Sequence, residues 1–281
     1  MSFPHNISIQ IATELLKEIE VIDIVIQGAL YGEFTLKTAK EYAKIPEVNK
    51  VIISTWEDQP IEEKMIQDDK IVLLKNKLIE NGGPGNMNYQ IVSSRKGVKE
   101  CHDGLVLKTR TDQHLYTESL YKWLEYFKKQ QYQNTLRYIN GERQRSKVYL
   151  VGNNKRFPFH PQDHFFLGYK QDVEKVFDLE LWEKPSWTWK DAPINFAERL
   201  RPNIYLGINY YMKFFPEIEK FFKEPELYLL DGSQKYEETM KFYSPIMNSV
   251  FSPLPRIDMW WAKQNSGYWY SYEKEGEYYA D

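Results

Sequence analysis

The 281-residue chain lacks several features that would define its class at once, beginning with cysteine. Its one cysteine, Cys101, excludes an internal disulfide and fits a reducing compartment. No apolar run approaches the roughly 20 residues that a membrane-spanning helix needs. The first residues do not join a basic region to a long apolar core, so no signal peptide is predicted. We therefore expect a cytoplasmic protein (in the host cytoplasm if the source is viral), for which peripheral membrane contact stays open.

The chain also lacks a large excess of charge of either sign. The 37 basic and 40 acidic side chains give a net charge of −3, and no run of five like charges occurs. A nucleic-acid-binding protein would show a basic face, so nucleic acid is not an expected partner. A P-loop, a G-x-G-x-x-G motif and histidine or cysteine pairs at zinc spacing are all missing. Cys101 has only His102 beside it and no third group to orient a base, so it is not an expected nucleophile.

What the chain does contain is an alternation of short apolar runs and helical patterns. Helical periodicity predicts helices, and buried apolar runs bounded by glycine, proline or charge predict strands. The predicted helices are 6–20, 33–44, 87–101, 117–130, 172–177 and 203–222. The predicted strands are 21–28, 51–57, 71–74, 104–112, 148–151 and 165–169.

This order favours one fold class. Strands that alternate with helices predict an α/β fold with a mostly parallel open sheet and helices on both faces. We expect one domain over residues 1–242. Residues 243–281, rich in tyrosine and tryptophan, are expected to pack on that core as a C-terminal extension.

The most informative segment is 104–112, Gly-Leu-Val-Leu-Lys-Thr-Arg-Thr-Asp. Because side chains alternate along a strand, Lys108, Arg110 and Asp112 share one face. Open α/β sheets bind ligands at the carboxyl ends of their strands. Two cations and a carboxylate there suit an anionic group such as a nucleotide diphosphate. A structural salt bridge between the basic side chains and Asp112 is the equally weighted alternative for this segment alone.

Other strand ends and one loop should converge on the same edge. The glycine loop 82–85 leads into a helix, and a helix N-terminus favours anions through its unpaired N–H groups. A small residue at the end of the first strand lets the backbone approach a nucleotide. The predicted nucleotide-sugar ligands, besides the three residues of the preceding paragraph, are Gln27, Gly28, Thr55, Trp56, Glu57, Asn86, Gln90 and Arg95.

A further carboxylate, Asp163, precedes the predicted strand 165–169 and is a candidate base. His164 beside it is expected to be a packed strand residue rather than a metal ligand.

Taken together, these segments resemble the WavE family of lipopolysaccharide and surface-polysaccharide synthesis. The similarity lies in Val-Ile-Gln-Gly at 25–28, Ile-Ser-Thr-Trp-Glu at 53–57, 88–94 with Gly97, Leu-Lys-Thr-Arg-Thr-Asp at 107–112, and 163–168. It extends to Arg-Pro-Asn-Ile-Tyr-Leu at 201–206, where Asn203 stands in place of a glutamate of the family element.

The resemblance implies a glycosyltransferase of the GT-A type, similar to hexosyltransferases, with a UDP- or GDP-type sugar donor and a glycan or lipid-linked acceptor. It also implies a divalent metal, Mn²⁺ or Mg²⁺, on Asp112, with Lys108 and Arg110 on the diphosphate. Because Asn203 cannot act as a base, that role is expected to pass to Asp163 or Glu198.

Two other functions stay open. A sugar-phosphate nucleotidylyltransferase is disfavoured because the glycine loop follows the third strand rather than the first. A non-catalytic glycan-binding protein that kept the fold is the second alternative, and Asn203 is the residue that keeps it open.

Overall fold

The computed structural model describes residues 21–61, 66–131, 137–151, 158–183, 202–220, 234–254, 257–264 and 266–270. The helix predicted for 6–20 lies outside them. None of the helices in these ranges has the length and apolar character required to cross a bilayer.

A seven-stranded sheet in the order β10-β8-β9-β4-β1-β2-β3 forms the centre of the molecule. Its strands are β1 (Ile22–Gln27), β2 (Val48–Trp56), β3 (Ile71–Asn76), β4 (Leu105–Arg110), β8 (Val148–Leu150), β9 (Phe166–Tyr169) and β10 (Phe251–Pro253). Strands β4, β1, β2 and β3 run parallel, whereas β9 is antiparallel to both of its neighbours. The predicted mostly parallel sheet is confirmed.

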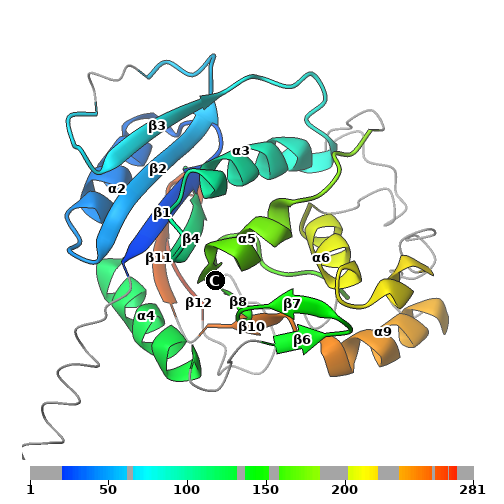
Figure 1. Cartoon of the computed structure of the whole chain (residues 1–281). Coiled ribbons are helices and arrows are strands. Elements are labelled where there is room, and N and C mark those ends of the chain that lie inside the picture. Colours follow the sequence, from blue (N-terminus) through cyan, green and yellow to red (C-terminus); the bar gives the residue numbers. More distant parts are fainter. Residues whose placement is uncertain are drawn as a thin grey trace, which may run out of the picture.

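Helices cover both faces of this sheet, as predicted (Figure 1). The side chains of β1 alternate between two cores: Ile24 and Ile26 pack with α2 and α4, and Val25 packs with α3, α5 and α6. This alternation explains why every residue of β1 is buried. The helices are α2 (Gly32–Ala43), α3 (Met87–Lys99), α4 (Thr117–Gln131), α5 (Lys170–Phe177), α6 (Pro202–Met212) and α9 (Gln234–Ile246).

Helix α3 lies directly on the sheet because of one glycine. A Cβ built on Gly97 would lie 2.4 Å from Cγ1 of Val25, which no real side chain tolerates. Cys101 follows this helix and is buried, and burial raises the pKa of its thiol. It is therefore an inert packing residue, in keeping with the sequence.

The strand order reverses between β1 and β4. From β1 the chain passes through α2 to β2 on one side, and after β3 it returns through α3 to β4 on the other side. At their carboxyl ends β1 and β4 stay side by side, and Gln27 pairs in register with Arg110 at this point. In an open α/β sheet this switch point is where a crevice for ligands forms.

The C-terminal part adds elements that the sequence patterns did not predict. Strand β5 (Gln113–Leu115) joins β11 (Ile257–Trp261) and β12 (Ser266–Tyr270) in a small antiparallel sheet. The short helix η5 (Ala262–Gln264) connects β11 to β12. The predicted boundary between residues 242 and 243 falls inside α9, and β10 belongs to the main sheet.

The remaining differences are local. The helix predicted for 203–222 ends at Met212, because Pro216 cannot continue it and forces Phe215 out of helical geometry. It is followed by the short helix η4 (Pro216–Ile218). The hairpin β6 (Arg137–Ile139) and β7 (Glu142–Gln144) turns at Asn140-Gly141, both at positive φ, a pair typical of tight hairpins.

Candidate functional site

A cleft of about 660 Å³ opens at the switch point between β1 and β4. We call it the strand-end cleft. Its lining residues are Gln27, Gly28, Ala29, Tyr31, Trp56, Gly83, Gly85, Asn86, Tyr89, Gln90, Arg110, Thr111, Asp112, Asp163, Pro202, Asn203 and Lys263. Eight of them were predicted as site residues from the sequence: Gln27, Gly28, Trp56, Asn86, Gln90, Arg110, Asp112 and Asp163.

The end of β1 forms one wall of the cleft through its backbone. Gly28 has a φ of 120°, a conformation that favours glycine, and a Cβ there would lie 3.3 Å from Thr111 Oγ1. The N–H of Gly28 donates to Ser54 O (3.0 Å), and Gln27 Oε1 accepts from Ser93 Oγ (2.7 Å). Hydrogen bonds to the neighbouring elements thus fix the position of the turn after β1.

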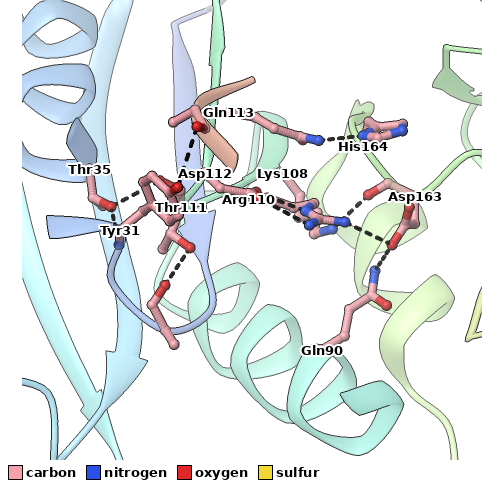
Figure 2. A network of polar contacts seen from close by, with 12 residues as sticks. Tyr31, Thr35, Gln90, Lys108, Arg110, Thr111, Asp112, Gln113, Asp163 and His164 are labelled. Carbon is pink, nitrogen blue, oxygen red and sulfur yellow. Dashed lines mark hydrogen bonds and ion pairs between the residues drawn. The ribbon is translucent and has the colours of Figure 1, made fainter. Parts of the chain in front are cut away.

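Arg110 at the end of β4 joins two carboxylates (Figure 2). Its Nε and Nη2 donate to the two oxygens of Asp112 at 3.0 and 2.9 Å, a bidentate pair. Its Nη1 lies 3.9 Å from Asp163 Oδ2. The salt bridge that the sequence left as an alternative therefore exists, and it lines the cleft.

Asp163 is the most constrained acid of the cleft. Gln90 Nε2 donates to its Oδ2 (3.0 Å) and Asn203 Nδ2 to its Oδ1 (3.4 Å). Burial alone would raise the pKa of this carboxyl, but Arg110, with His164, Lys108 and Gln90, lowers it to about 2. The side chain is therefore ionised at neutral pH.

Lys108 does not line the cleft, which corrects its predicted role on the diphosphate. It shares a face with Arg110, as predicted, but lies two residues earlier on β4 and so about 7 Å deeper in the sheet. Its Nζ donates to the backbone oxygen of Asp163 (3.0 Å) and lies over the rings of Phe166 and Phe177. Burial lowers the pKa of this amine to about 7. Lys108 therefore fixes the backbone of Asp163 from the core side of the cleft.

Three other predicted ligands also lie away from the cleft. Thr55 is buried in β2, and Glu57 is exposed, accepting from the N–H of Leu78 (3.4 Å). Arg95 turns to the opposite side of α3, where it donates to the backbone oxygens of Phe177 and Leu179. Glu198, the second candidate base, lies outside the described residues.

The glycine loop and the start of α3 reach the cleft as predicted. Asn86, at a φ of 65°, is the N-cap residue of α3, and no side chain caps the helix there. Trp56 and Tyr89 form an aromatic wall beside it, with ring centroids 5.0 Å apart. The start of α3 and an aromatic surface therefore lie together at one end of the cleft.

The metal predicted on Asp112 does not fit the donor set as arranged. Both oxygens of Asp112 accept from Arg110, whose positive charge occupies the place where a cation would lie. Burial lowers the pKa of His164 to about 4, and its Nδ1 is in contact with Gln113, in keeping with a packed residue. Nowhere in the described ranges do three or more histidine, cysteine or acidic side chains gather as a metal would require.

Lys263 is the functional candidate that the sequence patterns missed. It belongs to η5, which is tied to the cleft because Ala262 N donates to Asp112 O (2.9 Å) and Tyr31 Oη donates to Ala262 O (3.3 Å). Its side chain is exposed and lines the cleft. No local signal could place it, because its position depends on the pairing of β11 with β5.

Comparisons with known proteins place these observations in a family. The model of the family described as WavE lipopolysaccharide synthesis matches residues 22–200. No curated protein matches the chain in sequence. Among solved structures, S. aureus TarS 1-349 is 12% identical at a TM-score of 0.40, over 78% of this chain and 69% of that one. The 4-diphosphocytidyl-2C-methyl-D-erythritol synthase is 11% identical at a TM-score of 0.36, and the match covers 66% of this chain and 98% of that one. Structural likenesses this distant add no argument about activity.

Proposed function

Because the chain belongs to the WavE lipopolysaccharide synthesis family, we propose that it is a glycosyltransferase of polysaccharide synthesis. It moves a sugar from a nucleoside-diphosphate donor to a glycan or lipid-linked acceptor. The observation that carries the proposal is the position of Arg110, between Asp112 and Asp163 in a cleft at the switch point of the sheet. The mostly parallel sheet supports the GT-A type that the family resemblance implies.

The nucleoside half of the donor is assigned to the aromatic end of the cleft. The half-buried ring of Tyr89, packed on the buried Trp56, offers a stacking surface, and the turn after β1 lets the backbone approach at Gly28. Gln27 and Asn86 add amide groups that can pair with a base or a ribose.

The diphosphate is assigned to the cationic middle of the cleft. Arg110 and Lys263 supply positive charge, and the start of α3 supplies the positive end of the helix dipole. These groups replace Lys108 and Arg95 of the sequence prediction. Stabilising charge that develops on the leaving group is a large contribution to such a transfer.

Asp163 is assigned as the base that removes the proton from the acceptor hydroxyl. At a pKa of about 2 it is a weak base, because Arg110 and its other neighbours stabilise the carboxylate. A bound diphosphate competes for Arg110, and the loss of that contact raises the pKa of Asp163. Donor binding thereby makes Asp163 more basic when the acceptor hydroxyl needs it.

The first test is nucleotide binding without metal. UDP, GDP, CDP and ADP are added to the purified protein in EDTA and then with Mn²⁺, and unfolding temperature and affinity are measured. One nucleotide is expected to bind in EDTA; at ~100 times its dissociation constant it adds about 2.7 kcal/mol of stability. Binding only with Mn²⁺, and its loss in Asp112→Ala, would instead restore the metal assignment.

Turnover separates the alternatives. Hydrolysis of a sugar nucleotide, or transfer of its sugar, is expected of a glycosyltransferase. Consumption of a nucleoside triphosphate with a sugar 1-phosphate marks a nucleotidylyltransferase. Glycan binding without nucleotide binding marks the non-catalytic alternative, which the neutral Asn203 beside Asp163 favours.

A further inference from the structure

A second cavity, of about 610 Å³, lies between α2, the first turn of α4 and the small sheet. We call it the α2–α4 cavity. None of its lining residues lines the strand-end cleft. Its size is within the range of small-molecule and single-sugar sites. The proposed transfer reaction leaves it without a role.

The floor of the cavity is an aromatic surface. His114 of β5 and Trp260 of β11 are register partners, so both side chains project from the same face of the small sheet. The ring of His114 is stacked on Tyr42 at 5.3 Å, and its Nε2 lies 3.3 Å from Glu41 Oε2. On its other side Trp260 pairs with Gly267, and its own side chain is half-buried.

The walls add rings and hydrogen-bonding groups. Phe34 of α2 is half-buried, and Tyr116 is 41% exposed although it is a large aromatic residue. Glu41 and Glu118 place two exposed carboxylates at the rim. Burial lowers the pKa of His114, so at neutral pH its ring is uncharged and can both donate and accept a hydrogen bond.

This charge pattern favours a neutral ligand over an anion. Lys37, a lysine of the rim, already lies 3.5 Å from Glu33, and the two carboxylates repel an anion such as a phosphate. Flat rings beside carboxylates suit a sugar, whose C–H face packs on a ring while its hydroxyl groups donate to the acids.

The two cavities share a wall. Tyr31 lines the strand-end cleft and Phe34 the α2–α4 cavity, and their rings meet edge to face at 6.4 Å. On the C-terminal side, Trp260 lines one cavity and Lys263 the other. A chain of sugars with one end in the cleft therefore has a second ring-lined cavity beside it.

The geometry points to a second carbohydrate site: the α2–α4 cavity binds a neutral, hydroxyl-rich segment of a glycan. That this glycan is the acceptor rests on the proposed function, whereas the binding itself does not. The floor of His114 and Trp260 holds the sugar ring, and Glu41 and Glu118 accept from its hydroxyls.

The test is a glycan array of neutral oligosaccharides probed with the full chain, followed by calorimetry with the glycan that binds. Trp260→Ala and Tyr116→Ala are each expected to weaken that binding by about tenfold. Leu78→Ala, which removes a similarly exposed apolar side chain outside both cavities, is expected to leave it unchanged. Circular dichroism checks each fold, and Tyr116→Ala serves as the main variant if Trp260→Ala unfolds.

Three results overturn the inference: no neutral glycan binds, binding is unchanged in the folded variants, or only cationic amines bind and compete for the cavity. Affinity for the nucleoside diphosphate that binds among UDP, GDP, CDP and ADP is measured on the same samples and is expected to stay the same in Trp260→Ala and Tyr116→Ala. Nucleotide binding without glycan binding refutes this inference alone. Glycan binding that depends on Trp260 or Tyr116, without binding of any of the four nucleotides, refutes the proposed transferase and supports the second site.

Discussion

The two edges of the β1–β4 strand pair each hold a carboxylate, and their surroundings differ. At the amino edge, the side chain of Asp23 is fully buried. It accepts from Asn49 Nδ2 (2.9 Å), from the backbone N–H of His102 (2.7 Å), and lies 2.8 Å from His102 Nδ1. At the carboxyl edge, Asp163 keeps 14% of its side chain exposed and shares Arg110 with Asp112 across an open cleft.

The comparison shows how a carboxylate enclosed by its hydrogen-bond donors differs from one that lines a cleft. Asp23 accepts hydrogen bonds from groups packed around it, so none of its contacts is open to replacement by a ligand. Arg110 is only 26% exposed but faces the cleft, so an anion can take over its contacts with Asp112 and Asp163. Buried and satisfied polar groups stabilise a fold, whereas a shared cation at a cleft can change partners.

The largest expected effect lies at the carboxyl edge. Asp163→Asn removes the proposed base and should lower kcat by ~10²–10⁴-fold while nucleotide affinity is kept. Asp178→Asn, at an exposed carboxylate outside the cleft, is the control. If Asp163→Asn has normal kcat and Glu198→Gln has lost it, the base is Glu198; if both keep it, the assignment of a carboxylate base at either position is wrong.

At the amino edge the effect should be on stability alone. Asp23→Ala leaves the donors of His102 and Asn49 without their acceptor and should lower the free energy of unfolding by about 1–3 kcal/mol. Urea denaturation measures the loss, and nucleotide affinity of the folded protein should not change. A weaker affinity with unchanged stability would reverse the roles of the two edges.

Lys108 connects the core to the cleft, and its effect depends on pH. Its pKa is about 7 in the folded chain and near 10.5 when exposed, so between these values the unfolded state binds the proton and the folded state does not. Stability from this group therefore rises with pH in that window, by up to about 1.4 kcal/mol per pH unit. The free energy of unfolding of the wild type and of Lys108→Met is measured by urea denaturation across this pH window. If both proteins show the same dependence on pH, Lys108 is not charged differently in the folded and unfolded states.

The smallest effect is expected at Lys263, an exposed cation. Lys263→Gln should weaken nucleoside-diphosphate binding by about three- to tenfold and reduce its dependence on salt, because one screened charge is lost. Lys122→Gln, at an exposed lysine of α4 outside the cleft, is the matched control. Equal effects of the two substitutions would assign the loss to net charge rather than to contact with the ligand.

The sequence by itself determined the order of the strands and helices around β1–β4, and with it the edge of the sheet where the strand-end cleft lies. Its buried apolar runs, the alternation along 104–112 and the glycine loop before α3 are local patterns with a local cause. They were sufficient to bring Gln27, Trp56, Gln90, Arg110 and Asp163 into one cleft. Alternation gives the face of a strand on which a residue lies.

Only the tertiary structure decided how deep Lys108 lies, that Arg95 turns away, and that Lys263 and Trp260 reach the two cavities. Depth depends on where the strand ends relative to its neighbours, and the direction of Arg95 depends on carbonyl groups more than 80 residues away. The pairing of β11 with β5 joins residues more than 140 positions apart. Contacts at such separations arise from the packing of the whole chain, and no periodicity of a local segment records them.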